Sequence, residues 1–243
     1  MIPKIIHYCW FGGKPLPKLA KQCIRSWKKY CPDFEIKEWN ESNSPLHLFP
    51  FVEEAVKAKK WAFVSDVIRL YALATEGGIY MDTDVELLKP LESFCIHHAF
   101  SGYERDSNKI QTAIMGAEPN AEWVLDNLSI YKKLHFDFNT IYYQSIINNY
   151  LLSDLLASKG LILDGKYYES DYVTIYPKDY FCPMSCGSHF IEKNENTVCI
   201  HYYSFSWADV ITFKQHLRKQ LIALLGEKRF RTIVNSIRKI RLR

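Results

Sequence analysis

The first forty residues alternate between strand-like and helix-like segments, and this order limits the folds that the chain can adopt. An apolar run over Lys4–Phe11, which ends at Gly12-Gly13, predicts a buried strand. Apolar residues three and four positions apart predict a helix over Lys18–Tyr30, and the alternation in Phe34–Trp39 predicts a second strand. A strand–helix–strand unit with short connections favours parallel pairing within one sheet. We therefore expect an α/β fold with a mostly parallel central sheet.

The rest of the chain continues this pattern. The predicted helices cover Phe51–Lys60, Trp61–Glu76, Ala121–Tyr131 and Asn139–Lys159, and the predicted strands cover Ile79–Leu88, Ile110–Ala117 and Val173–Tyr176. A length of 243 residues suits one sizeable domain, and the sequence shows no convincing interdomain linker. We assign residues 1–212 to a single domain and residues 213–243 to a basic helical tail.

The tail differs in charge from the rest of the protein. Residues 214–243 contain ten Lys and Arg against one acid, so the remainder of this chain of net charge +4 carries a charge of −5. Apolar residues recur at helical spacing among the basic ones, which predicts an amphipathic helix. Such a helix is either a solvated surface element or a contact with an anionic membrane.

Cysteine usage and the N-terminus bear on the compartment. Seven cysteines at irregular spacing favour reduced thiols over a disulfide framework. The set Cys182, Cys186, His189, Cys199 and His201 fits no standard zinc spacing. The N-terminal sequence lacks a signal-peptide pattern, and no apolar run reaches the roughly 20 residues of a membrane span. We expect a cytoplasmic protein, peripheral on the inner face of the cell membrane if the tail binds lipid.

Two carboxylates lie two residues apart in the segment 77–86, which reads GGIYMDTDVE. If this segment is one strand, one face carries Tyr80, Asp82, Asp84 and Glu86. Neighbouring carboxylates repel each other unless a positive charge lies near them, and Mg²⁺ and Mn²⁺ prefer oxygen ligands. A D-x-D tripeptide alone also fits two solvated acids. The preceding Gly-Gly and the apolar strand favour a metal site.

Two further groups of residues are candidates for the same site. Asp66 and Arg69 are neighbours on the surface of the helix Trp61–Glu76, where they form a local ion pair or hold a sugar or phosphate. Trp10, at the end of the first strand, either stacks on a base or packs in the core.

The segment 201–209, which reads HYYSFSWAD, carries the last candidates. A neutral His201 could bind a metal, and Ser206 and the Trp207 indole could donate hydrogen bonds to phosphate oxygens. A lone histidine is otherwise a structural residue, so these roles depend on the other parts of the site.

In this order, IPKIIHYCWFGG, WAFVSDVIRLYAL, GGIYMDTDVE and HYYSFSW resemble the motifs of the DXD-containing glycosyltransferases of family 32. That family includes capsular polysaccharide and mannosyltransferase-type enzymes. The order is also similar to that in the glucosyltransferase domains of large clostridial toxins. The resemblance spans residues 2 to 209. It implies a GT-A, Rossmann-like fold and transfer with retention of the anomeric configuration.

The resemblance also implies roles for individual residues. The implied donor-binding residues are Trp10 at the base, Asp66 and Arg69 at the transferred sugar, Tyr80, Asp82, and Ser206 and Trp207 at the diphosphate. A Mn²⁺ or Mg²⁺ ion would be bound by Asp84, by His201, and by Asp82 through water. Asp82, Asp84 and Trp207 would be the catalytic residues, and Ser204 could take the place of Ser206.

These features predict a metal-dependent retaining glycosyltransferase. It would move a sugar from a nucleotide-diphosphate sugar, a UDP-sugar rather than a GDP-sugar, to a glycan or lipid-linked saccharide in surface polysaccharide synthesis. A nucleotide-sugar hydrolase or a nucleotidyltransferase would also use paired acids, although neither a Gly-rich phosphate loop nor a clear water-activating base is evident. A non-catalytic carbohydrate- or membrane-binding protein would not need the Asp pair. No nucleic-acid recognition motif accompanies the basic tail, so we expect no nucleic-acid partner.

Overall fold

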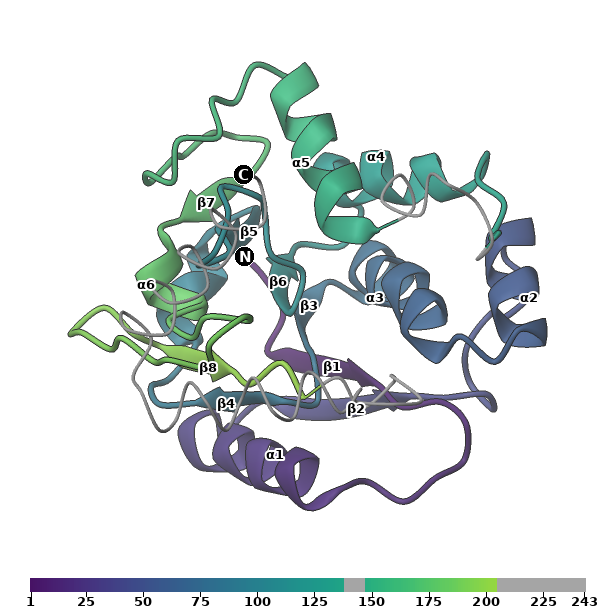
Figure 1. Ribbon diagram of the computed structural model, residues 1–243, viewed down its shortest axis with the longest axis horizontal. Helices are drawn as coiled ribbons and strands as arrows, with labels where there is room; N and C mark the ends of the chain where they lie inside the picture. Colours follow the sequence, from purple (N-terminus) through teal and green to yellow (C-terminus); the bar gives the residue numbers. More distant parts are fainter. Residues whose placement is uncertain (138–146, 205–243) are drawn as a thin grey trace, which may run out of the picture.

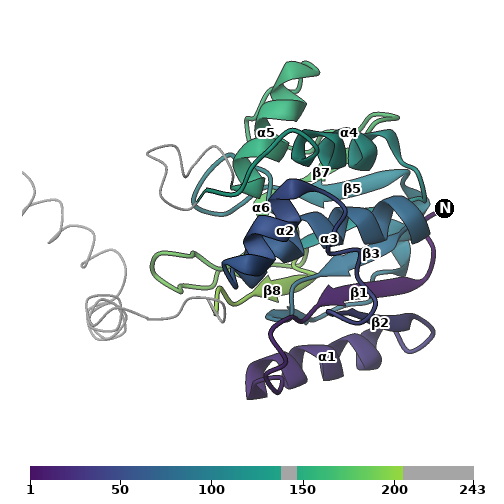
Figure 2. The same cartoon turned by 90° about the vertical axis from the view of Figure 1, so that its right-hand side faces the viewer.

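The computed structural model describes residues 1–137 and 147–204, and it has helices on both faces of a central sheet (Figures 1 and 2). The helices are α1 (Lys18–Tyr30), α2 (Pro50–Lys57), α3 (Trp61–Glu76), η1 (Glu92–Ile96, a 3-10 helix), α4 (Glu122–Tyr131), α5 (Asn148–Ser158) and α6 (Lys178–Phe181). The strands are β1 (Ile5–Cys9), β2 (Glu35–Trp39), β3 (Gly78–Met81), β4 (Val85–Leu87), β5 (Ala99–Gly102), β6 (Ile114–Ala117), β7 (Thr174–Tyr176) and β8 (Cys199–His201). In the described part of the chain, none of the helices is long and apolar enough to cross a bilayer.

The central sheet has the strand order β2-β1-β3-β6-β5-β7. The pairs β1–β2, β1–β3 and β5–β7 are parallel, and β6 is antiparallel to both of its neighbours. The predicted βαβ unit is confirmed, because β1 and β2 pair in parallel from Ile5–Glu35 to Cys9–Trp39. The expected mostly parallel sheet is confirmed as well, with β6 as the exception.

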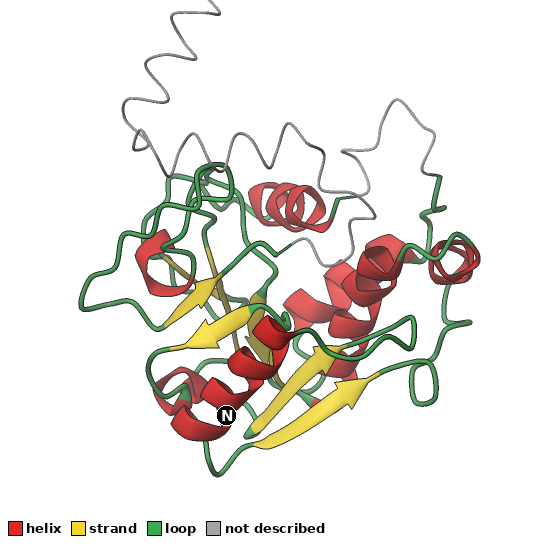
Figure 3. Ribbon diagram, turned by 60° about the horizontal axis from the view of Figure 1, so that its bottom comes forward, coloured by secondary structure: helices red, strands yellow, loops and turns green. Residues whose placement is uncertain are grey.

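Helices lie on both sides of this sheet (Figure 3), and the buried side chains form two hydrophobic cores, one on each face. Strand β3 shows how the sequence divides between them. Ile79 and Met81 pack into the core that contains Trp27 of α1, whereas Tyr80 packs into the core formed with α2, α3 and α4. Because side chains alternate along β3, this strand packs against the helices on both faces of the sheet.

The Gly-Gly pair ends α3 and starts β3. Gly77 and Gly78 have φ angles of 65° and 100°, in the left-handed region that favours glycine. A Cβ on Gly78 would lie 2.7 Å from the carbonyl oxygen of Ile5, so this turn lets β3 approach β1 closely. His7 Nε2 donates to the Gly77 carbonyl at 2.7 Å, because its Nδ1 accepts from Trp39 Nε1 at 3.0 Å. His7 is thus a buried structural residue whose pKa is lowered chiefly by burial.

The prediction of one strand over Ile79–Leu88 is wrong. Strand β3 ends at Met81, and β4 belongs to a separate two-stranded sheet with β8. Between them, the Val85 N–H donates to the Asp82 carbonyl at 3.0 Å and closes a turn. Asp82 itself still donates its N–H to Ala113 at 2.8 Å. The chain therefore leaves the central sheet immediately after Asp82.

Other predictions were correct in kind but differ in extent. The helices Lys18–Tyr30 and Trp61–Glu76 have the predicted bounds, whereas the strand predicted over Ile110–Ala117 shortens to β6. Strand β5, helix η1 and helix α6 were not predicted, because each has only four or five residues. The predicted start of the helix Asn139–Lys159 and the tail 213–243 lie outside the described residues. All seven cysteines are free thiols, as their irregular spacing predicted.

Candidate active site

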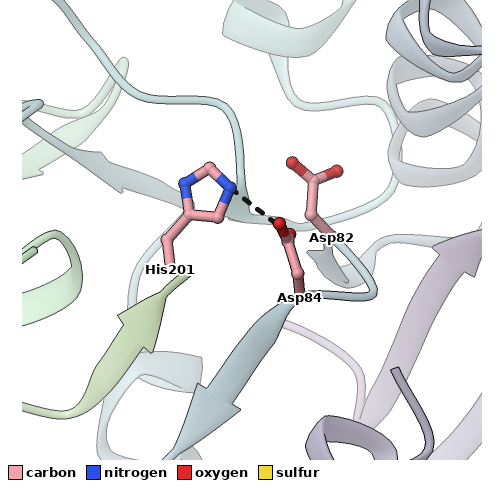
Figure 4. Close-up of side chains that lie close together, drawn as sticks. All are labelled: Asp82, Asp84 and His201. Carbon is pink, nitrogen blue, oxygen red and sulfur yellow. Dashed lines mark ion pairs between the residues drawn. The ribbon is translucent and has the colours of Figure 1, made fainter. Parts of the chain in front are cut away.

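Three possible metal ligands meet where β3 ends (Figure 4). Asp82 follows β3, Asp84 precedes β4, and His201 is the last residue of β8. One ligand atom of each residue lies within 4.8 Å of those of the other two. His201 Nε2 is 3.3 Å from Asp84 Oδ1. Because β4 pairs with β8 so that Val85 faces His201, the small sheet carries the imidazole to the carboxylates.

This donor set fits a divalent ion. Two carboxylates and one imidazole suit Mn²⁺ or Mg²⁺ with water and phosphate oxygens completing the shell. Within residues 1–137 and 147–204, this is the one group of three or more His, Cys, Asp or Glu side chains close enough to share an ion. In that part of the chain, the set Cys182, Cys186, His189, Cys199 and His201 forms no metal-binding group of its own. Instead, Cys182 Sγ lies 2.9 Å from the Tyr203 hydroxyl.

The chain after β8 fixes the position of Asp84. The Ser204 N–H donates to Asp84 Oδ2 at 2.7 Å, and the Tyr202 N–H donates to the Asp84 carbonyl at 3.0 Å. Tyr203 between them has a φ of 49°, which is uncommon for a residue other than glycine. This turn directs the Ser204 amide at the carboxylate. Ser204 contacts Asp84 through its backbone N–H, a contact that residue type alone does not reveal.

The charges of Asp84 and His201 stabilise each other. Burial raises the pKa of Asp84, but the positive charge of His201 and the Ser204 amide outweigh burial and hold the pKa below its usual range. Burial lowers the pKa of His201, but Asp84 outweighs this effect and raises it. A metal ion that binds His201 competes with a proton for the imidazole nitrogen.

Arg69 connects this cluster to α3. Its Nη2 lies 3.0 Å from Asp66 Oδ1 and 3.3 Å from Asp82 Oδ1. The side chains of Arg69 and Asp66 are only 6% and 12% exposed, so the pair is not the weak surface ion pair considered from the sequence. Arg69 Nη1 also donates to the Thr112 carbonyl at 2.6 Å, and the guanidinium lies 4.5 Å from the centre of the Tyr80 ring.

Burial perturbs the acids around Arg69. Burial raises the pKa of Asp66 to about 7, although Arg69 acts against this increase. The pKa of Asp82 is raised by burial as well, again against the effect of Arg69. The Tyr80 hydroxyl donates to Asp82 Oδ1 at 2.9 Å, and Asn148 Nδ2 donates to Asp66 Oδ1. Perturbed carboxyl groups that converge on one place are typical of functional sites.

Asn148 has no counterpart in the sequence predictions. It lies 82 residues from Asp66 and occupies the first position of α5. Because no local pattern links two residues so far apart, only the fold brings them together. The Thr112 carbonyl that Arg69 contacts was missed for the same reason.

Trp10 lies just beyond β1, at the sheet edge where Asp82 follows β3. Its indole is partly buried, and Nε1 donates to the Lys14 carbonyl at 2.5 Å. Beside it, the Gly12 N–H donates to Glu41 Oε1 at 2.6 Å, and residues 41 and 44–48 line a hollow of about 440 Å³. Trp10 packs against the core that contains Trp27, and its indole stays partly exposed at this edge. Ser206 and Trp207 lie outside the described residues.

A family described as the glycosyltransferase sugar-binding region containing a DXD motif matches residues 17–101. This range includes Asp66, Arg69, Asp82 and Asp84. Toxin Afp18 of Yersinia ruckeri serotype O1 is 42% identical to this protein over 52 residues, which are 21% of this chain and 2% of the toxin. The chain therefore aligns with only a small part of that relative.

Two solved structures share the fold. The PaToxG glycosyltransferase is 19% identical, with a TM-score of 0.51, over 65% of this chain and 70% of that chain. A glycosyltransferase involved in the glycosylation of the major capsid of PBCV-1 is 15% identical, with a TM-score of 0.50, over 91% of this chain and all of the other. The fold is of the GT-A type. Taken with the DXD-region match over residues 17–101, the fold makes the protein similar to glycosyltransferases, in agreement with the sequence prediction.

Proposed function

We propose that this protein is a metal-dependent, retaining glycosyltransferase of family 32. It moves a sugar from a nucleotide-diphosphate sugar, a UDP-sugar rather than a GDP-sugar, to a glycan or lipid-linked saccharide in surface polysaccharide synthesis. The observation that carries the proposal is the continuous cluster in which Arg69 joins Asp66 to Asp82, beside Asp84 and His201. The cluster lies at the carboxyl end of β3, where α/β sheets bind ligands.

The ligand atoms of Asp84 and His201 would hold Mn²⁺ or Mg²⁺, and Asp82 would reach it through water. When bound, the ion neutralises the negative charge that develops on the departing diphosphate. Asp82 suits an indirect contact, because its Oδ1 is already engaged by Tyr80 and Arg69. Ser206 and Trp207 are proposed to donate to the diphosphate from the chain that follows Ser204.

The remaining residues of the cluster would orient the donor. Trp10 stacks on the base, and Asp66 and Arg69 hold hydroxyl groups of the transferred sugar. Because Arg69 pairs with Asp66 and with Asp82, neither carboxylate is a strong nucleophile. We therefore favour front-side displacement. The bond from the anomeric carbon to the donor phosphate breaks, the acceptor oxygen forms the new bond on the same face, and its proton passes to a phosphate oxygen.

We further propose that residues 1–212 form the catalytic domain of a cytoplasmic protein and that the tail 213–243 binds an anionic membrane surface. The charge of the tail supports this proposal, since it carries ten Lys and Arg among its last thirty residues. Co-sedimentation with vesicles of phosphatidylglycerol should decrease when residues 213–243 are deleted. Unchanged sedimentation of the shortened protein would remove the membrane from the proposal.

Calorimetric titration tests the donor site directly. UDP and GDP are titrated into the protein with Mn²⁺ and with a chelator, beside Asp84→Asn. An exposed acid on α5, Asp154, supplies the control Asp154→Asn. We expect UDP binding that needs Mn²⁺, persists in the control and disappears in Asp84→Asn. Failure of the folded wild type to bind either nucleotide would refute the transferase proposal. Release of free sugar without transfer would instead indicate a hydrolase.

A further inference from the structure

The outer face of α1 carries a row of cations that the proposed donor chemistry does not use. Its members are exposed and follow one another at spacings of three, four and three residues, so they share one side of the helix. This basic row consists of Lys18, Lys21, Arg25 and Lys28. The buried side chains on the opposite side belong to Ala20, Cys23, Ser26 and Trp27. Figures 1 and 2 both show α1 at the lower edge of the protein, so the basic row faces outwards.

Buried hydrogen bonds fix the direction of the basic row. The Trp27 indole Nε1 donates to the Val85 carbonyl at 2.7 Å, and the Leu87 N–H donates to the Ser26 hydroxyl at 2.9 Å. Both contacts fasten the inner side of α1 to β4, and a rotation of the helix about its axis would break them. Because β4 begins directly after Asp84, α1 holds the basic row at a set place relative to the candidate metal site.

Acidic side chains do not neutralise the basic row. None of its four members forms an ion pair within residues 1–137 and 147–204. Glu86 of β4 reaches α1, but it accepts from Gln22 at 3.1 Å and from the Tyr202 hydroxyl instead. Lys4 shows the contrast, since it pairs with both Asp33 and Glu92. The basic row therefore keeps its charge for a partner outside the described residues.

The stability of α1 does not account for the basic row. Like charges three or four residues apart on a helix repel each other, and Lys21 and Arg25 are such a pair. Lys18 and Lys21 also lie in the first turn, where the helix dipole favours acids over cations, and this turn contains no acid. A partner with negative charge would offset both of these unfavourable effects.

The basic row belongs to an uneven distribution of charge along the chain. The first acid of the sequence is Asp33, so residues 1–32, with seven Lys and Arg, carry a charge of +7. The whole chain carries +4 and its last thirty residues carry +9, which leaves a charge of −12 for residues 33–213. An anionic surface attracts the basic face of such a molecule and repels its acidic body, so it favours one orientation.

We propose that the outer face of α1 binds an anionic membrane surface, with the helix lying along the plane of the lipid headgroups. The 13 residues of α1 extend about 20 Å, so a flat surface contacts the whole basic row at once. Sites for single-stranded nucleic acid combine cations with aromatic side chains that stack on bases, whereas Gln22 is the one exposed residue of α1 that is not a cation. The contact is separate from the one proposed for the tail, and it does not depend on sugar transfer.

The test measures the binding of the full chain to vesicles. Wild type and variants are co-sedimented with vesicles of phosphatidylcholine, with and without phosphatidylglycerol. One variant changes three members of the basic row: Lys18→Gln, Lys21→Gln and Arg25→Gln. The matched control removes the same charge from exposed sites outside α1: Lys132→Gln, Lys133→Gln and Lys193→Gln. Every variant keeps the tail, so a difference between the two comes from α1.

We expect the wild type to bind only the anionic vesicles and to be released by high salt. Each basic residue near an anionic surface strengthens binding about fivefold, so the α1 variant should bind about tenfold to a hundredfold more weakly. The control variant should stay within about threefold of the wild type. Glutamine is a good helix former, so thermal unfolding should show both variants folded. A second variant, Lys18→Glu with Lys21→Glu, places acids where the helix dipole favours them and should bind at least as weakly.

Three results would overturn the proposal. One is a wild type that does not bind the anionic vesicles, and another is an equal loss in the α1 variant and the control. The third is tighter binding to an oligonucleotide than to the vesicles, lost in the α1 variant, which would assign the basic row to nucleic acid. The Kd for UDP with Mn²⁺ should be the same in the α1 variant and the wild type. Failure of the donor site and failure of the membrane contact are therefore distinguishable.

Discussion

Replacing Arg69 with Met should destabilise the protein strongly, because Arg69 is the cation shared by two acids. Its guanidinium lies 3.0 Å from Asp66 and 3.3 Å from Asp82, and its side chain is 6% exposed. Methionine retains much of the length of the side chain but no charge. The variant therefore leaves two carboxylates without their cation, and it also removes the donor to the Thr112 carbonyl.

The size of the effect follows from burial. Removing one partner of a buried ion pair costs about 3–5 kcal/mol, since the other charge stays buried and unpaired. The Asp82 side chain is 27% exposed, so water reduces its share and the lower end of that range applies. A loss of about 3 kcal/mol lowers the melting temperature of a protein of this size by about 6–12 °C.

The loss should also depend on pH. Without Arg69, the pKa values of Asp66 and Asp82 rise further above those of the unfolded chain. A carboxyl group with a raised native pKa contributes stability that is full below its unfolded pKa and is lost as pH rises through its native pKa. The free energy of unfolding of Arg69→Met should therefore fall further below that of the wild type at pH 8 than at pH 5.

Urea denaturation at the two pH values measures this difference. Lys4→Met is the control, because Lys4 also pairs with two acids, Asp33 and Glu92, but all three side chains are at least 42% exposed, and such pairs contribute about 1 kcal/mol or less. Adding Asp66→Asn to Arg69→Met should restore part of the stability. A loss below about 1 kcal/mol at pH 8, or an equal loss at both pH values, would refute the view that Arg69 neutralises these acids.

Three further predictions concern the same framework. Gly116→Ala should lower the free energy of unfolding in urea by about 1–3 kcal/mol, because the new Cβ would overlap the fully buried Phe100 ring. An unchanged free energy of unfolding would mean that β5 and β6 move apart at little cost. Asp66 has a native pKa of about 7 against 3.8 for the free side chain, so the stability of wild type relative to Asp66→Asn should fall between pH 4 and pH 7, by up to about 1.4 kcal/mol per pH unit. A constant difference across that range would show that Asp66 does not hold a proton. Trp39→Phe removes the donor to His7 Nδ1 and should cost about 1–3 kcal/mol by thermal unfolding, and an unchanged melting temperature would argue against that hydrogen bond.

The sequence alone determined those elements whose pattern is local. The apolar spacing over Lys18–Tyr30 and Trp61–Glu76 predicted α1 and α3 at both ends, because helical periodicity repeats every three to four residues. The Gly-Gly pair that precedes the apolar strand in the sequence forms the turn into β3, since its positive φ angles are open to few other residues. The closeness of the Asp82 and Asp84 side chains followed from their separation by two positions in the sequence.

Only the tertiary structure decided how the site is assembled. The alternation in Ile79–Leu88 does not show that the chain leaves the central sheet after Asp82, because strand continuity depends on partners elsewhere, such as Ala113. His201 reaches the carboxylates through pairing of β8 with β4, and Asn148 reaches Asp66 across 82 residues. Whether an Asp–Arg pair on a helix is a weak surface contact or a buried junction depends on what covers it. Local sequence does not encode that burial, since it arises from segments that are distant in the chain.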